Sequence, residues 1–439
     1  MNFRICRLLR SRILVGSALA LIAGTIVAAE PLPFSGEFTG DWFGVRRTLR
    51  EDGVDIQLSY VSETASNVKS DVKTRVLYTD QYTFGMTLDL EKLLNIKEGQ
   101  FQGTITDRNG QNLSSAANLN TLQLVQEVYG RGQTWLITQF WYRQQFFSDS
   151  VDWKIGKMTT GEDFATIKCD FMNLTFCGSP PGLLVSDYWY NWPLSVWASR
   201  VKIALEDSAY IELGGYEVNP KYQLQRYAFT LAAPPGATGA LLPLEVGWLP
   251  LFGSAHLQGS YKSGAWYDTS TSKDVVNNVN GQPLLIAGGE AQLHHGRYGG
   301  YVDLLQQLTH IDGGTPNGGL SVFANATAAD RRTAFTDNIV TAGVLYSGMF
   351  VSRPTDDIAL AVGRTHVNGR VTQSEQLLNV AGLGPSRVQT SEYVSEAYYS
   401  LHATPWLVLR ADFQYIHQPD GVRQRTNDIV LGLKLVLDL

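Results

Sequence analysis

Segments of about ten residues, in which apolar and polar side chains alternate, recur along this chain. The C-terminal stretch is the clearest case: odd positions from Ile429 to Leu439 are all apolar, whereas Asp428, Gly432, Lys434 and Asp438 lie on the even side. Successive side chains of a strand point to opposite faces, so one face suits hydrocarbon and the other suits water. The longest uncharged run after residue 29, residues 227–244, is broken by Pro234-Pro235-Gly236, which excludes a spanning helix there.

Period-two patterning predicts sixteen strands along the chain. They are expected near 54–63, 80–90, 100–108, 133–147, 151–158, 196–205, 208–217, 240–248, 254–266, 298–308, 319–329, 337–352, 357–368, 389–403, 406–418 and 427–439. The predicted fold class is therefore all-β.

The connections between these strands alternate in length. Short links are expected at 148–150, 206–207, 250–253, 353–356 and 403–405, and long ones at 64–79, 109–132, 159–195, 218–239, 267–297 and 369–388. Such parity is typical of a 16-stranded antiparallel transmembrane β-barrel of the bacterial outer membrane, with short turns in the periplasm and long loops outside. A secreted β-sandwich or β-propeller is the alternative, although neither needs this parity.

The N-terminus has the features of a secretory signal peptide. Four arginines precede an apolar core over 13–27, and Val27-Ala28-Ala29 provides small residues for cleavage after Ala29. We therefore expect a signal peptide at 1–29, an N-terminal periplasmic segment at 30–53 and a barrel at 54–439. Within the periplasmic segment, Asp41 is expected to cap a short amphipathic helix over 42–51.

Charge and cysteine content refine this interpretation. Removing the signal peptide leaves 31 basic and 41 acidic residues, a net charge of −10, which argues against nucleic acid as a partner. Cys169 and Cys177 are the two cysteines that remain, and export to an oxidising compartment favours a disulfide between them.

The less apolar face of each strand should line the lumen. On this basis the predicted pore-lining residues are Trp141, Arg143, Arg200, Lys202, Glu212, Glu392, Glu396, Arg410 and Asp412. Because the charges are of both signs and aromatic residues lie among them, the lining suits small neutral sugars better than ions. The alternative is that mixed charges simply keep a water-filled lumen wet.

The longest connection, 159–193, carries the two cysteines and the aromatic residues Tyr188, Trp189, Tyr190 and Trp192. A loop stiffened by a disulfide can narrow a pore without collapsing. We therefore expect this loop to fold into the lumen and form the constriction, with an external flap as the alternative.

A series of motifs gives the chain a family resemblance. The motifs are 40–46 (GDWFGVR), 154–157 (KIGK), 163–165 (DFA), 171–173 (FMN), 177–180 (CGSP), 261–268 (YKSGAWYD), 353–357 (RPTDD) and 404–406 (TPW). In this order they resemble the carbohydrate-selective porins of the OprB family over nearly the whole chain. The resemblance implies a sixteen-stranded outer-membrane barrel that passes monosaccharides or small oligosaccharides by passive diffusion. The chain departs from that pattern by ending in Leu439 instead of an aromatic residue, and in the length of 275–297.

Two other functions share some of these features. A barrel-borne hydrolase would need a nucleophile and a base, but none of the seven histidines lies in a recognisable catalytic motif, so we expect no enzyme. A conduit for polysaccharide export would share the barrel and differ in its cargo. No cofactor or metal site is expected, and the predicted partners are sugars and outer-membrane lipid. Both a monomer and a homotrimer are compatible with the sequence.

Overall fold

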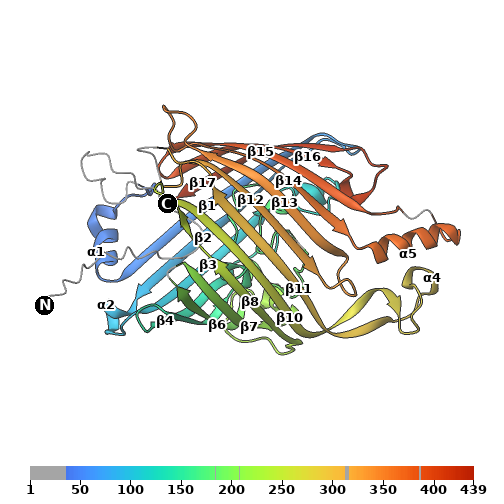
Figure 1. Ribbon diagram of the computed structural model, residues 1–439, viewed down its shortest axis with the longest axis horizontal. Coiled ribbons are helices and arrows are strands. Elements are labelled where there is room, and N and C mark those ends of the chain that lie inside the picture. Colours follow the sequence, from blue (N-terminus) through green and yellow to red (C-terminus); the bar gives the residue numbers. More distant parts are fainter. Residues whose placement is uncertain (1–35, 183, 207, 312–315, 385–386) are drawn as a thin grey trace.

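The computed structural model describes residues 36–182, 184–206, 208–311, 316–384 and 387–439. The predicted signal peptide at 1–29 lies outside these residues. The described chain forms a single sheet of antiparallel strands that closes into a tilted barrel (Figure 1).

Sixteen long strands form the barrel in the described residues. They are β1 (Val54–Lys69), β2 (Val76–Asp89), β3 (Gly99–Gly110), β4 (Leu136–Phe146), β5 (Val151–Met158), β6 (Val196–Glu206), β7 (Ala209–Val218), β8 (Gly239–Trp248), β10 (Leu257–Asn278), β11 (Ala291–Gln307), β12 (Gly319–Ala329), β13 (Thr336–Ser347), β14 (Asp357–Val367), β15 (Ser391–Thr404), β16 (Leu407–His417) and β17 (Asp428–Asp438). The two-residue strand β9 (Leu251–Phe252) pairs only with the start of β10.

Each strand pairs with its neighbours in sequence, and the ring is closed by the first and last strands. Strand β1 pairs with β2 on one side and with β17 on the other, where Tyr60 lies opposite Leu437. Strand β8 pairs with β10 from Leu241 to Trp248. Closure leaves no unpaired strand edge, as a barrel in lipid requires. The predicted 16-stranded antiparallel barrel is confirmed.

Two predicted loops turn out to be mostly strand. The loop expected at 64–79 is reduced to 70–75, because β1 and β2 continue to Lys69 and from Val76. The loop expected at 267–297 is largely a hairpin of β10 and β11 around 279–290. In 269–278 polar residues occupy both strand faces, so the sequence lacks the one-sided apolar pattern on which the prediction depended.

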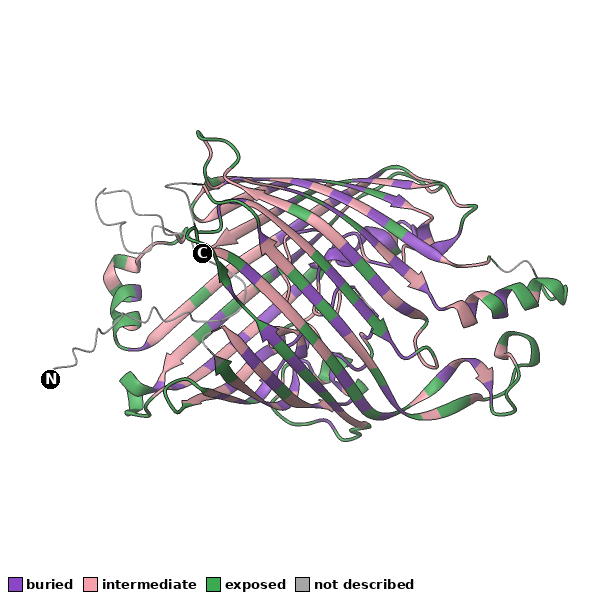
Figure 2. Ribbon diagram, in the orientation of Figure 1, coloured by how far each residue is buried: buried purple, intermediate pink, exposed green. Residues whose placement is uncertain are grey.

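The alternation seen in the sequence appears as alternating burial along the strands (Figure 2). In β8, Leu242, Leu244, Val246 and Trp248 are exposed on the outer face, whereas Leu241 and Glu245 are fully buried. The outer face of the barrel is therefore apolar, and polar side chains such as Glu245 point inward.

Both ends of the barrel carry short helices. The C-terminus, α1 (Val45–Glu51) and α2 (Leu90–Leu94) lie at one end, which we call the turn end (Figure 1). The hairpin of β10 and β11 with α4 (Leu284–Ala287), together with α5 (Gly369–Val380), lies at the other, the loop end. Helix α3 (Leu113–Ala116) belongs to the loop between β3 and β4. Among the described residues, no helix combines the length and apolarity needed to cross a bilayer.

The helix predicted over 42–51 is present but broken. A 3-10 turn, Trp42–Gly44, precedes α1, and Gly44 rather than Asp41 is the residue before the first α-helical turn. Gly44 has φ +94°, a left-handed conformation that favours glycine. The Asp41 carboxylate instead accepts a hydrogen bond from the backbone N–H of Arg47, 3.0 Å away.

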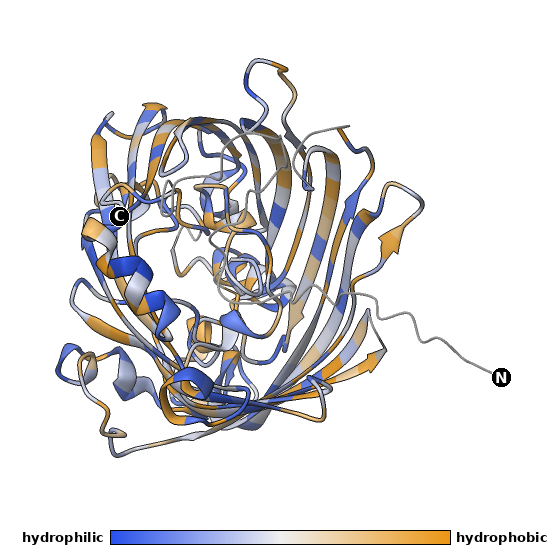
Figure 3. Ribbon diagram, turned by 90° about the vertical axis from the view of Figure 1, so that its left-hand side faces the viewer, coloured by the Kyte–Doolittle hydropathy of each residue, from blue (hydrophilic) through white to orange (hydrophobic). Residues whose placement is uncertain are grey.

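The interior of the barrel is occupied by chain from the loop end (Figure 3). Residues 111–135 and 159–195 contribute most of the buried side chains that pack against the strands. One buried cluster joins Phe164, Trp189 and Tyr190 to β6–β8 and β10–β11, and a second joins Leu113, Leu119 and Phe171 to β14–β17.

Candidate functional site

Eight charged side chains gather on the inner face of β4–β7 and on the residues that follow β5. We call them the mixed-charge network. It contains four cations and four carboxylates: Arg143, Lys154, Arg200, Lys202, Asp152, Glu162, Asp163 and Glu212. The formal charges cancel, so the network presents fixed charges of both signs without a net field of one sign.

Arg200 lies at the centre of the network. Its guanidinium contacts three carboxylates: Asp152 at 2.8 Å, Asp163 at 3.1 Å and Glu212 at 2.8 Å. Burial alone would raise the pKa of Asp163, but the Lys154 ammonium and the Arg200 guanidinium hold it below the ordinary value of an aspartate. Asp163 therefore stays ionised and fixes the start of the loop against the barrel wall.

Lys154 links the loop to an aromatic side chain. Its Nζ lies 2.7 Å from Glu162 Oε1 and 2.6 Å from Asp163 Oδ2, and 4.9 Å from the centre of the Trp141 ring. Glu162 is held in place because Thr159 and Glu162 form a capping box around the 3-10 turn Thr160–Glu162.

The edges of the network are formed by Arg143 and Lys202. Arg143 Nε donates to Asp152 Oδ2 at 2.8 Å. Lys202 Nζ lies 3.4 Å from Glu212 Oε2 and 3.7 Å above the centre of the Tyr210 ring. With side chains 15% and 27% exposed, Arg143 and Lys202 remain accessible to water in the lumen.

From this network the chain crosses the lumen. We call residues 163–177 the crossing segment. Its Ala165 N–H donates to Glu245 of β8, and Lys262 of β10 donates to the carbonyl of Thr166 at 2.7 Å. Farther on, Arg410 of β16 lies 3.2 Å from Asp170. The segment therefore contacts strands on both sides of the barrel.

The far end of the crossing segment is anchored by acidic side chains of the wall. Glu396 accepts hydrogen bonds from the backbone N–H groups of Met172 at 2.6 Å and Asn173 at 3.0 Å. Glu392 accepts them from Leu122 and Gln123 of the neighbouring inner loop. Both glutamates are fully buried beneath the loops that they hold.

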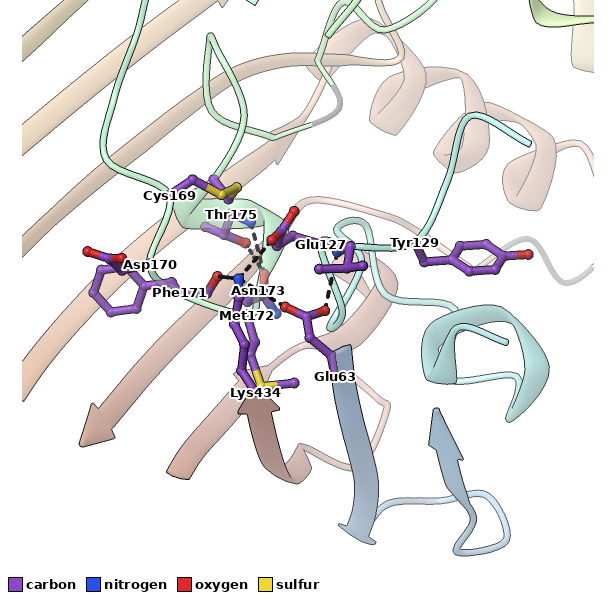
Figure 4. The surroundings of a disulfide bond; sticks show 12 residues. Glu63, Glu127, Tyr129, Cys169, Asp170, Phe171, Met172, Asn173, Thr175 and Lys434 are labelled. Carbon is purple, nitrogen blue, oxygen red and sulfur yellow. Dashed lines mark hydrogen bonds and ion pairs between the residues drawn. A yellow bond between two sulfur atoms is a disulfide. The ribbon is translucent and has the colours of Figure 1, made fainter. Parts of the chain in front are cut away.

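The Cys169–Cys177 disulfide lies within this segment, with 4.7 Å between the Cα atoms (Figure 4). Burial alone would raise the pKa of Asp170, but Lys168 and Arg410 hold it below its ordinary value. Nearby, Lys434 of β17 bridges Glu63 of β1 at 3.1 Å and Glu127 at 2.7 Å. The stapled loop thus rests on a second set of ion pairs.

Among the described residues, one group of potential metal ligands was found: Glu127 with Cys169 and Cys177. Metal binding requires thiolates, and these two sulfurs are joined to each other. The group is therefore part of the disulfide region.

The nine residues predicted to line the lumen fall into two groups. Trp141, Arg143, Arg200, Lys202 and Glu212 lie in or beside the mixed-charge network on β4, β6 and β7. Glu392, Glu396, Arg410 and Asp412 lie on β15 and β16 beneath the two inner loops. The crossing segment spans the distance between the groups.

Several residues of the site were missed by sequence reasoning. Asp152 and Lys154 share one face of the predicted strand 151–158, and Glu245 alternates with apolar residues in 240–248, so the pattern could have revealed them. Glu162, Asp163 and other loop carboxylates carried no such signal, because strand periodicity does not extend into loops.

Comparison with known proteins identifies the family. The family described as "Carbohydrate-selective porin, OprB family" matches residues 73–439. Porin B of Pseudomonas aeruginosa is 41% identical over 432 residues, covering 95% of this chain and 94% of that protein. Putative porin QuiX of Acinetobacter baylyi is 32% identical over 419 residues, covering 91% and 92%.

A solved structure agrees with these sequence matches. The high-pH structure of Pseudomonas putida OprB has a TM-score of 0.88 to this chain at 39% identity, covering 92% of this chain and 98% of that chain. The resemblance predicted from the motifs is confirmed. This outer-membrane β-barrel belongs to the OprB family of carbohydrate-selective porins, which are channels and not enzymes.

Proposed function

We propose that the barrel passes monosaccharides and small oligosaccharides by passive diffusion, through a narrow passage lined by the mixed-charge network and the crossing segment. The observation that carries the proposal is the charge balance of the network, in which four cations, Arg200 at their centre, pair with four carboxylates. A ring of one sign would concentrate counter-ions, whereas balanced charges favour a neutral solute with many hydroxyl groups.

The chemistry of the network suits such a solute. Charged donors and acceptors such as Arg143 and Lys202 can bind sugar hydroxyls. The rings of Trp141 and Tyr210 are buried beneath the Lys154 and Lys202 ammonium groups, so they hold these cations in place. In this proposal Arg143 and Lys202 touch the solute, and Trp141 positions Lys154. Glu392 and Glu396 act through the loops, because their carboxylates bind backbone N–H groups.

Export of a polymer is the less favoured alternative. The crossing segment contacts β8, β10 and β16, and so divides the lumen through which an extended polysaccharide would have to pass. Single-channel conductance in planar bilayers separates the two functions. We expect graded block by glucose and maltose and little block by charged amino acids. Preferential block by long anionic oligosaccharides would instead support export.

Replacing residues of the network tests where the sugar passes. We expect Trp141→Leu and Arg143→Gln each to weaken glucose block about three- to tenfold. Arg143→Gln removes a charged group that touches the sugar, and Trp141→Leu removes the ring that positions Lys154, each contributing roughly 0.5–1.5 kcal/mol. Block is measured as the glucose concentration that halves the open-channel current.

The matched control is Tyr142→Leu, which alters the neighbouring residue on the opposite face of β4. Its ring packs edge-to-face on Trp153, 6.2 Å away, and should not reach the lumen. Glucose block that is the same in all three variants and in the parent protein would disprove this placement of the sugar path.

We also propose that the chain reaches the outer membrane through a signal peptide at 1–29 that is cut after Ala29. The expected mature protein begins at Glu30, which mass spectrometry of the purified protein can establish. A mature N-terminus that retains the apolar core at 13–27 would show that this segment anchors the chain instead.

A further inference from the structure

A cavity of about 440 Å³ opens at the loop end of the barrel, away from the mixed-charge network. Three chain segments form its walls: the inner loop around Gln123, the segment at 184–188, and the connection between β12 and β13. Arg297, near the loop end of β11, completes it. We call this space the vestibule cavity. Neither the network nor the crossing segment contributes a lining residue to it.

One wall of the vestibule cavity is held by a buried arginine. Arg297 lies 2.8 Å from the buried Asp268 carboxylate and also pairs with Asp187. Its guanidinium carbon lies 3.9 Å above the centre of the Tyr188 ring. The Tyr188 hydroxyl in turn accepts a hydrogen bond from Trp266 Nε1 at 3.0 Å. The segment at 184–188 is thereby fixed in position before any ligand binds.

The remaining groups in the cavity are hydroxyls, a carboxylate and an exposed ring. Ser186 and Thr333 offer hydroxyl groups, and the Asp187 side chain is 65% exposed. Phe335 lines the same space and is 43% exposed, although it lies outside the strands that face lipid. A solvent-exposed ring beside hydroxyl-binding groups is the arrangement that a sugar needs.

Charge decides which hydroxylated ligand fits. The positive charge of Arg297 is already matched by Asp187 and Asp268, so the cavity holds no unpaired cation for an acidic ligand. A volume of about 440 Å³ lies within the range of small-molecule sites. We propose that the vestibule cavity is a separate binding site for a neutral mono- or disaccharide, which it captures before the sugar enters the narrow passage.

This inference rests on the proposed function but adds a second site to it. A site at the mouth of the barrel raises the local sugar concentration beside the narrow passage. The rate of uptake should therefore increase most when the external sugar is dilute. The two sites share no residue, so each can be disabled without altering the side chains of the other.

A cysteine protection assay measures occupancy of the vestibule cavity directly. Thr333→Cys places a thiol in the lining, and Cys169 and Cys177 do not compete for reagent because they are joined to each other. We expect glucose and maltose to slow modification of this thiol in a saturable way, and gluconate to protect it less. The same sugars should leave Gln376→Cys on α5 unprotected, since no residue of α5 lines the cavity.

Two further variants in the Thr333→Cys protein identify the contacts. Phe335→Ala should raise the glucose concentration for half-protection about three- to tenfold, because it removes the stacking face. Asp187→Asn leaves Arg297 with one carboxylate fewer, so gluconate should then protect better than in the parent. The matched control is Phe229→Ala, which removes another exposed ring, 60% accessible, from the loop between β7 and β8.

Absence of protection by either sugar would overturn the proposal, even if glucose still permeates and blocks the channel. Protection that is unchanged by Phe335→Ala would overturn the proposed contacts. If sugars protect the thiol but do not permeate, the vestibule site stands and the proposed function fails, so the two failures are distinguishable.

Discussion

Deleting residues 165–180 and joining the ends with a short glycine-serine linker is expected to raise single-channel conductance roughly two- to threefold, because the narrowest cross-section sets ion flow. The deletion removes the part of the chain that bridges Glu245 on one wall and Glu396 on the other. It removes both partners of the disulfide together, so no free thiol remains in the described part of the chain. Preference for glucose over charged solutes of similar size should fall at the same time.

A second deletion controls for the loss of loop residues in general. Removing 280–289 shortens the hairpin tip around α4, whose main contacts are with β10 and α5. Conductance should then be unchanged. Gel electrophoresis verifies that both variants still form barrels, because a folded barrel migrates differently before and after heating. A variant lacking 165–180 that folds and conducts like the parent would show that the narrowest point lies elsewhere.

The barrel wall could be predicted from the sequence because one physical rule governs it. Each strand meets hydrocarbon on one side, so period-two alternation marks strands as short as 151–158 and places Arg200 and Glu212 on the same inner face. The rule fails where the surroundings change. Beyond the lipid, as in 269–278, no hydrocarbon requires an apolar outer face, so polar residues occupy both faces and the pattern disappears although the strand continues.

The contacts inside the barrel could not be predicted in the same way. The alternation predicts Glu392 and Glu396 to face the lumen, but it does not predict their partners, which are backbone N–H groups of Leu122, Gln123, Met172 and Asn173. Every residue except proline carries such a donor, so no side-chain pattern reveals which one a carboxylate will bind. The loop at 159–193 was expected to enter the lumen because a disulfide stiffens it, but the route of the crossing segment across the lumen depends on backbone contacts that the sequence does not mark.

Replacing Arg46 with alanine is expected to lower the free energy of unfolding by about 3 kcal/mol, two charge-assisted hydrogen bonds at roughly 1.5 kcal/mol each. Arg46 on α1 is 2% exposed and donates to the carbonyls of Leu439 and Ile56, each at 3.0 Å. These carbonyls lie at the ends of β17 and β1, the two strands that close the ring. Because Arg46 joins the two strands that close the ring, losing its hydrogen bonds should affect stability more than a loop change would.

The neighbouring Arg47 provides a matched control, since it has the same side chain on the same helix but is 52% exposed and pairs with Asp41 at 3.3 Å. We expect Arg47→Ala to change stability by less than about 0.5 kcal/mol, because exposed ion pairs contribute little. Urea titration of the refolded barrel in micelles, followed by heat-dependent gel mobility, measures both variants. Arg46→Lys should fall between them, because one ammonium replaces a planar group that reaches two carbonyls at once. Equal urea midpoints for Arg46→Ala and Arg47→Ala would show that Arg46 of α1 does not stabilise the pairing of β1 with β17.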